Sequence, residues 1–196
     1  MIPLSLAPSQ WDPLIATLSA RYCTISLGGP LLGVVGVLEE RGHSNYLTIV
    51  KGLLDLVDIR PNEVVLEVGG GSGVIIREIV RRTAGANPII DVDISPYLLR
   101  EAEALTKQAG LADRISFQEG NVEAIPLDSV DVALSFTVME EGDADRMLSE
   151  LLRVTRPGGR IAAMVRSLDM PWWINAALSP ALRGKVDAPG KGDVAP

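Results

Sequence analysis

The sequence has few of the residues that disulfides, zinc sites and nucleic-acid surfaces require. It holds one cysteine and one histidine among 196 residues, so neither an intramolecular disulfide nor a zinc site made of histidine and cysteine can form. Acidic residues outnumber basic ones by 25 to 18, and the net charge is −7. Because binding to a phosphate backbone needs clustered Lys and Arg, we expect no nucleic-acid partner. No metal site is predicted.

Long hydrophobic runs are also scarce. The most apolar stretch, residues 25–38, is interrupted by Gly28, Gly29 and Pro30 and is shorter than the roughly 20 apolar residues that a transmembrane helix needs. The N-terminus has no basic region ahead of an apolar core, so it does not resemble a signal peptide. A single cysteine fits a reducing compartment. We therefore predict a cytoplasmic protein without a transmembrane segment.

Three zones follow one another along the chain. Residues 1–60 predict an N-terminal helical cap or lid, with helices over 9–20, 30–41 and 44–57 that begin at Ser9, Pro30 and Ser44. Residues 61–166 alternate short β-branched runs with helical patterns. Residues 167–196 are rich in Pro and Gly and predict a partly irregular tail that contains Trp172 and Trp173.

The middle zone predicts an α/β fold. Its expected strands are 64–68, 88–92, 114–118, 130–135 and 160–165, and its expected helices are 74–83, 96–109 and 143–154. Such alternation is typical of βαβ units, so we predict a Rossmann-like parallel sheet with helices on both faces. The basic run from Arg77 to Arg82 is expected to be a solvated helix face. A turn at residues 157–159 is expected to precede the fifth strand.

The most informative segment is the glycine-rich loop between the first strand and the next helix. It contains Gly69, Gly70, Gly71 and Gly73, and Glu67 precedes it. Ligands bind at such strand–helix junctions in parallel sheets. Glycine allows a tight turn there and lets a ligand approach the backbone closely.

Two kinds of cofactor use glycine loops of this type. The dinucleotide fingerprint GxGxxG requires a third glycine that packs the helix against the strand, and that position falls on Val74 or Ile76 here. The fingerprint is therefore not met, and an NAD(P)-dependent oxidoreductase becomes the less favoured alternative.

The acidic-x-Gly-x-Gly-x-Gly pattern from Glu67 to Gly73 resembles motif I of class I S-adenosylmethionine-dependent methyltransferases. Within that family the chain is similar to small-molecule methyltransferases of the ubiquinone and menaquinone biosynthesis type. The resemblance implies that the loop passes beneath the methionine part of S-adenosylmethionine. It also implies that Glu67 lies near the amino group of this cofactor.

The resemblance further implies an acid at the end of the second strand that accepts both ribose hydroxyls. A carboxylate suits this task because its two oxygens accept from two donors. Asp93 stands there, and the adjacent Ile94 is another expected cofactor contact. Asp91 is a rival on the same strand face, at a position where the family often has Gly.

The adenine end is expected to meet the run from Gly120 to Pro126. The family often has an aspartate that accepts from the adenine amino group, and this chain has Asn121 instead. The backbone amide of Val122 would address a ring nitrogen of the adenine. Ser135, at the end of the fourth strand, completes the expected cofactor contacts.

The catalytic residues remain unassigned from the sequence. His43 is a candidate for substrate contact or general base, although it also suits a surface turn. Glu140 and Glu141 stand where the family can have a histidine, and a pair of solvated acids is an equal alternative. Tyr22 and Tyr46 are candidate substrate contacts because they lie in the predicted lid.

The expected reaction is methyl transfer from S-adenosylmethionine to a small-molecule acceptor, with S-adenosylhomocysteine as product. The family's sheet usually continues beyond the fifth strand with a hairpin of two further strands, for which we find no pattern after Val165. A sheet truncated there would leave an open edge, which predicts a homodimer through that edge or the tail. The absent hairpin and Asn121 also keep a non-catalytic, cofactor-binding protein or partner subunit as an alternative.

Overall fold

The structure is a computed structural model that describes residues 12–24 and 33–166. Its elements, in chain order, are α1 (Asp12–Ser19), α2 (Gly33–Glu40), the 3₁₀ helix η2 (Arg41–His43), α3 (Asn45–Val57), β1 (Val65–Val68), α4 (Val74–Arg82), β2 (Ile89–Asp93), α5 (Pro96–Gln108), β3 (Ile115–Glu119), β4 (Val130–Phe136), the 3₁₀ helix η3 (Met139–Glu141), α6 (Ala144–Val154) and β5 (Thr155–Met164).

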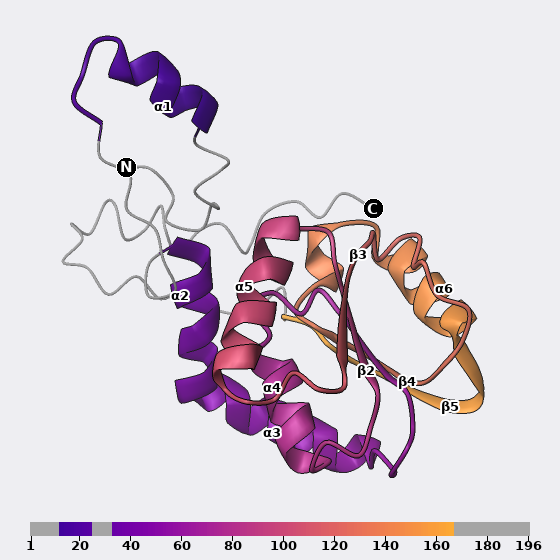
Figure 1. Cartoon of the computed structure of the whole chain (residues 1–196). Coiled ribbons are helices and arrows are strands. Elements are labelled where there is room, and N and C mark those ends of the chain that lie inside the picture. Colours follow the sequence, from indigo (N-terminus) through magenta and orange to yellow (C-terminus); the bar gives the residue numbers. More distant parts are fainter. Residues whose placement is uncertain (1–11, 25–32, 167–196) are drawn as a thin grey trace, which may run out of the picture.

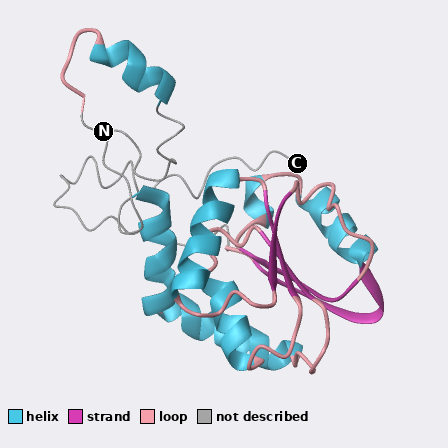
Figure 2. Ribbon diagram, in the orientation of Figure 1, coloured by secondary structure: helices cyan, strands magenta, loops and turns pink. Residues whose placement is uncertain are grey.

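The five strands form one sheet in the order β3-β2-β1-β4-β5, and every pair of neighbours is parallel. Helices α2, α3, α4 and α5 lie on one side of this sheet and α6 lies on the other (Figures 1 and 2). The predicted Rossmann-like α/β fold is confirmed. Helix α1 lies away from this α/β body in Figure 1.

The central strands β1, β2 and β4 are covered on both faces, and their side chains alternate between two apolar layers. Val65 and Leu134 belong to the layer that includes residues of α3 and α4, whereas Leu66 and Ala133 belong to the layer that includes residues of α6. Because side chains along a strand point alternately to opposite faces, continuous apolar runs are what such a doubly covered strand needs.

Side chains cap the starts of α3, α5 and α6, where α6 is capped by Asp143. The Ser44 hydroxyl accepts from the amide of Tyr46 at the start of α3, as predicted, and the Ser95 hydroxyl accepts from the amide of Leu98 at the start of α5. Pro96 occupies the first turn of α5, where the missing amide proton costs nothing. These caps place α3 and α5 beside the strand ends that carry the glycine loop and Asp93.

Strand β5 begins earlier than predicted. Thr155 pairs with Val130, and regular pairing resumes only at Arg160 opposite Val132. The expected turn is therefore a bulge inside the strand, with Gly158 at a φ of 77°. The Arg156 guanidinium pairs with the Asp131 carboxylate, which holds the bulge against β4.

The prediction of a solvated basic face on α4 is wrong at Arg77. This side chain is buried, its guanidinium pairs with Glu39 of α2, and it also donates to the carbonyl of Ser72 at 2.9 Å. Arg82 is exposed as expected and pairs with Asp55 of α3. A basic run on a helix can thus include an interior residue when a neighbouring helix supplies the matching carboxylate.

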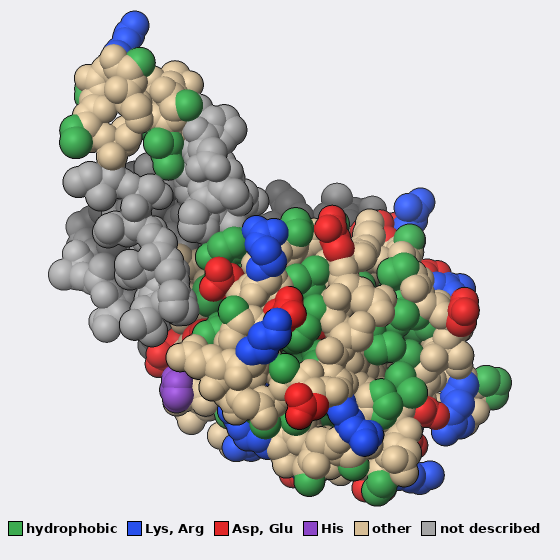
Figure 3. Space-filling model, viewed as in Figure 1, with side chains coloured by type: hydrophobic (Ala, Val, Ile, Leu, Met, Phe, Trp, Pro, Cys, Tyr) green, Lys and Arg blue, Asp and Glu red, His purple; other side chains and the backbone are tan. Residues whose placement is uncertain are grey.

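Several sequence predictions lie outside the described residues. These are the helix starts at Ser9 and Pro30, the tail with Trp172 and Trp173, and the missing sixth and seventh strands. Within residues 12–24 and 33–166, no helix is both long enough and apolar enough to cross a bilayer. On the face shown in Figure 3, basic and acidic side chains are interspersed rather than segregated.

Helix α6 offers a matched test of the core. Leu151 is fully buried, whereas its neighbour Leu152 is 60% exposed. We expect Leu151→Ala to lower the free energy of unfolding by about 2–5 kcal/mol, because it removes buried methyl groups and leaves a cavity. Leu152→Ala should change it by less than about 0.5 kcal/mol. Urea unfolding followed by circular dichroism measures both, and equal losses would contradict the described packing of α6.

Candidate functional site

The glycine loop lies at the point in the sheet where the strand order reverses. The chain runs from β1 to β2 on one side, while β4 pairs with the other side of β1. A crevice between oppositely directed crossovers is where open α/β sheets bind ligands, outside the carboxyl ends of the strands. Residues 69–73 leave β1 at this point and enter α4.

The loop is packed so closely that side chains would not fit. Gly69 has a φ of 67° and lies against the side chain of Val138. Gly71 has a φ of 60°, and a Cβ added there would lie 3.0 Å from the Leu38 Cδ1 of α2. Glycine is therefore required at both positions by backbone conformation as well as by space. The second contact also shows that α2 lies directly over the loop.

Three carboxyl groups lie in a row beside this loop. Glu67 and Asp91 are direct partners in the register of β1 and β2, and Asp93 follows two residues later on the same strand face. All three are buried, with exposed fractions of 1%, 0% and 6%. The Asp93 carboxylate accepts from the amides of Gly71 at 3.0 Å and Ser95 at 2.8 Å, so it ties the loop to the start of α5.

Several buried oxygens around the loop lack a hydrogen-bond partner among the described residues. They are Glu67 Oε2, both carboxyl oxygens of Asp91, and the hydroxyls of Ser72 and Ser135. Buried polar atoms are nearly always paired in folded proteins, and an unpaired one is costly. A cluster of them at a strand–helix junction therefore indicates where a polar ligand binds.

The surroundings of these acids raise their pKa values. Burial raises the pKa of Glu67 well above its ordinary range, and the nearby carboxyls of Asp91 and Asp93 raise it further. Burial and the charge of Asp93 raise the pKa of Asp91 to about 8. Burial also raises the pKa of Asp93, although its two amide hydrogen bonds oppose this. A cationic ligand would allow these acids to ionise.

The segment expected to meet adenine lies beside Asp93. The amide of Gly120 donates to the carbonyl of Asp93 at 3.1 Å. The Asn121 side-chain oxygen accepts from the amide of Glu123 at 2.8 Å, which leaves it one further lone pair. No described residue accepts from the Val122 amide. Ile94 is 68% exposed at the end of β2, where it offers an apolar surface.

The segment from α2 to η2 covers the loop and is held in place by an ion pair. The Arg77 guanidinium donates to both carboxyl oxygens of Glu39, at 2.8 and 2.6 Å. Leu38, Arg41, Glu67 and residues 69–72 line a small cavity of about 30 Å³ between this segment and the loop. The site is therefore enclosed by the N-terminal helices on one side and by the loop on the other.

Tyr46 lies at this site, and two residues that the sequence analysis did not single out lie with it. The Arg41 guanidinium donates to the Thr137 hydroxyl at 3.2 Å, and the Tyr46 hydroxyl lies 3.5 Å from the same oxygen. Thr137 follows β4 with a φ of 56°, which is strained for a β-branched residue. Neither Arg41 nor Thr137 belongs to a recognisable motif, so only the fold brings them together.

The remaining candidates are not gathered at the loop. His43 is exposed, and its side chain forms no hydrogen bond to another described residue. Tyr22 is 65% exposed and follows α1. Glu140 and Glu141 both pair with Arg166. Burial raises the pKa of Glu140, but its hydrogen bonds and ion pair with Arg166 outweigh this and leave the pKa lowered, which disfavours it as a base.

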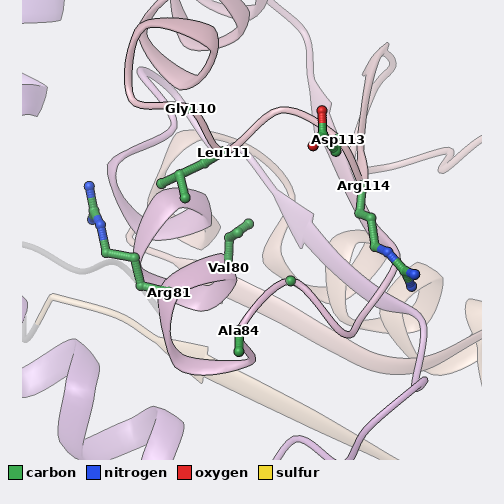
Figure 4. A pocket seen from close by; sticks show the side chains of 8 residues that line it. Val80, Arg81, Ala84, Gly110, Leu111, Asp113 and Arg114 are labelled. Atoms are coloured by element: carbon green, nitrogen blue, oxygen red, sulfur yellow. The ribbon is translucent and has the colours of Figure 1, made fainter.

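A larger hollow, of about 380 Å³, lies elsewhere on the molecule (Figure 4). It lies between the end of α4 and the segment that leads into β3, and Val80, Leu111 and Arg114 are among the residues that line it. This is the amino end of β3, opposite to the end at which parallel sheets bind ligands. None of the residues that line this hollow has an unpaired buried polar atom. We therefore place the site at the glycine loop, although the cavity there is smaller than the hollow.

Comparison with known proteins agrees with this geometry. Residues 65–159 match the family model described as a methyltransferase domain. The ubiquinone/menaquinone biosynthesis C-methyltransferase UbiE of Acidiphilium cryptum is 35% identical over 108 residues, which cover 54% of this chain and 43% of that protein. The chain thus spans less than half the length of the curated relatives it matches.

Solved structures show the same fold. A Haloferax volcanii methyltransferase structure, solved in a complex with the methyltransferase activator Trm112, aligns with a TM-score of 0.58 and 28% identity over 66% of this chain and 56% of that one. An Aquifex aeolicus S-adenosylmethionine-dependent methyltransferase aligns with a TM-score of 0.61 over 80% of this chain and 87% of that one, at 16% identity.

Residues 65–159 therefore form a methyltransferase domain. This confirms the resemblance inferred from the glycine loop, and with it S-adenosylmethionine as the cofactor of the domain. The unpaired oxygens of Glu67, Ser72 and Ser135 fit such a ligand, because it carries an ammonium group and hydroxyl donors. The comparisons do not favour the partner-subunit alternative.

The free energy of unfolding should depend on pH because of Asp91. Its pKa rises from an ordinary value of 3.8 to about 8 on folding, so the unfolded chain loses this proton at a lower pH than the folded one. Stability is therefore lost as pH rises from about 4 to about 8. Asp91→Asn removes this titration. We therefore expect the free energy of unfolding of the variant, measured relative to that of the wild type, to be higher at pH 8 than at pH 5. Urea unfolding at both pH values measures this, and a constant difference would contradict the burial of an unpaired acid.

Proposed function

We propose that this chain transfers a methyl group from S-adenosylmethionine to a small-molecule acceptor. The observation that carries the proposal is the set of unpaired buried oxygens, on Glu67, Ser72 and Ser135 among others, around a glycine loop at the switch point of the sheet. The match of residues 65–159 to a methyltransferase domain supports the reaction type. The acidic balance of the chain supports a small molecule rather than nucleic acid as acceptor.

The residues that would hold the cofactor are those predicted from the sequence. Gly69, Gly70, Gly71 and Gly73 would bring the backbone close to its methionine part, and Glu67 would meet the amino group. Asp93 would accept from the ribose hydroxyls with the lone pairs that the two loop amides leave free.

The adenine end would be bound by short-range contacts from two loops. Asn121 and the amide of Val122 would bond its edge, and Ile94 would cover its face. Ser135 would contribute a hydroxyl at the end of β4. Asn121 is neutral, so its bond to the adenine amino group lacks the charge assistance of an aspartate.

The cofactor supplies a methyl group already activated on a sulfonium. The work left to the protein is to align the two reactants and to exclude water. Residues 33–43, with Leu38 over Gly71, suit this second task, and we propose that they are part of the lid predicted over residues 1–60. The Glu39–Arg77 ion pair would hold the lid closed.

A general base is needed only if the acceptor is not already ionised. Tyr46 lies beside Arg41 and Thr137 at the site, whereas His43 and Tyr22 do not, and Glu140 and Glu141 are paired with Arg166. Burial raises the pKa of Tyr46, so we propose that its phenol contacts the acceptor as a hydrogen-bond donor rather than as a base. An acceptor whose hydroxyl or enol is already ionised needs no further base.

Two finer predictions stay predictions, namely a homodimer and a cytoplasmic location. β5 has β4 on one side only among the described residues, which keeps its edge open for a second copy of the chain. The Haloferax volcanii methyltransferase was solved with an activator protein, which supports a different protein as the alternative partner of this chain. A cytoplasmic location rests on the single cysteine.

Product formation tests the proposed function. We expect release of S-adenosylhomocysteine when the protein is supplied with S-adenosylmethionine and a panel of quinol-type and phenolic acceptors. Asp93→Asn should raise KM for the cofactor by about 10-fold or more, because a charged acceptor is lost from the ribose site. Asp113→Asn, an exposed acid at the opposite end of the sheet, is the matched control and should leave KM unchanged.

Calorimetry with S-adenosylmethionine distinguishes the alternatives. Binding without product across the panel would favour the non-catalytic cofactor-binding alternative. Absence of binding by the folded wild-type protein would overturn both that alternative and the enzyme.

A further inference from the structure

Three side chains from separate elements meet above the glycine loop. Two of them, Arg41 and Thr137, are 96 residues apart in the sequence. Arg41 comes from η2, Tyr46 from the first turn of α3 and Thr137 from the end of β4. The Arg41 guanidinium donates to the Thr137 hydroxyl at 3.2 Å and lies 5.0 Å from the centre of the Tyr46 ring. The Tyr46 hydroxyl lies 3.5 Å from the Thr137 hydroxyl. All three polar groups thus converge on one place.

Arg41 differs from the other arginines of the domain core in having no anionic partner. The guanidinium groups of Arg77 and Arg160, which are also at least partly buried, each pair with a carboxylate, whereas Arg41 has no carboxylate within ion-pair distance among the described residues. It is half-buried. Among the described residues its side-chain partners are the hydroxyls of Thr137 and Tyr46, so this half-buried charge is not balanced by an anion and keeps free N–H donors.

The position of this cluster connects it to the cofactor loop. Arg41 lines the same cavity as Glu67, Phe136 and residues 69–72. Thr137 is held at a φ of 56°, and a β-branched residue keeps such a conformation only where its surroundings enforce it. Strain of this kind gathers at ligand sites, and here it aims a hydroxyl at an unpaired guanidinium.

We propose that Arg41, Tyr46 and Thr137 form a binding site for a single carboxylate at the mouth of the cofactor loop. The proposal rests on the proposed function. A guanidinium binds a planar carboxylate through two parallel hydrogen bonds, and the two hydroxyls add donors beside it. The carboxylate belongs either to the methionine end of the cofactor or to an acidic acceptor.

The charges around the cluster favour a carboxylate over a phosphate. Glu67 lines the same cavity, and Asp91 and Asp93 lie next to it in the sheet. Glu39 is engaged by Arg77 on the lid side. One unpaired guanidinium facing a row of acids can balance a single negative charge but not two.

Calorimetry with two ligands that differ only at the amino-acid end tests the site. S-adenosylhomocysteine carries the carboxylate, and 5′-methylthioadenosine shares its adenosine thioether but lacks the amino-acid end. If the carboxylate is the cofactor's, Arg41→Met should weaken S-adenosylhomocysteine binding by about 10- to 100-fold and leave 5′-methylthioadenosine unchanged. Arg100→Met, which removes an exposed charge on α5, should change neither.

A second arm tests the acceptor as the source. Protein loaded with S-adenosylhomocysteine is titrated with 4-hydroxybenzoate and with its methyl ester. If the acceptor supplies the carboxylate, the wild type should prefer the acid by about 10-fold, and R41M should lose this preference while it binds S-adenosylhomocysteine normally.

The remaining outcomes overturn the proposal. It fails if R41M binds all four ligands as the wild type does. It also fails if R41M weakens 5′-methylthioadenosine as much as S-adenosylhomocysteine, because Arg41 would then shape the loop rather than bind a carboxylate. Wild-type protein that binds neither nucleoside would instead contradict the proposed function itself.

Discussion

The row of buried acids beside the glycine loop constrains the rest of the site. Glu67, Asp91 and Asp93 lie on adjacent strands with little access to water, and only Asp93 is satisfied by backbone amides. Unpaired buried carboxyls are costly, so a fold keeps them where they serve a ligand or a proton. The loop turns above them on glycines because neither Val138 nor Leu38 leaves room for a side chain. The cover supplied by α2 and η2 then excludes water from the same place.

Much of this arrangement could be predicted from short-range patterns. Apolar runs of β-branched residues predicted the five strands, and Ser44 predicted the start of α3, because both depend on local conformation. The glycine spacing after Glu67 predicted the loop and its ligand class, since a tight turn at a strand end tolerates few other residues. The methyltransferase family match confirms that prediction.

Other parts depend on contacts between distant residues and could not be predicted. Arg77 looked like part of a solvated basic face until α2 placed Glu39 against it. Thr137 and Arg41 are ordinary residues in sequence, and only the pairing of β4 with β1 and the packing of η2 bring them to one place. The bulge in β5 arises from pairing to β4, so a Pro-Gly-Gly turn alone did not indicate that the strand continues through it.

The most direct measurement of the central claim is a crystal structure of the chain with S-adenosylhomocysteine. We expect the ligand at the glycine loop, with its ribose on Asp93, its amino group beside Glu67 and its adenine against Ile94 and Val122. The segment from α2 to η2 should cover its methionine end. A ligand bound instead in the larger hollow beside Val80 and Leu111, with the loop unchanged, would contradict the claim that the buried acids and the glycine loop form the cofactor site.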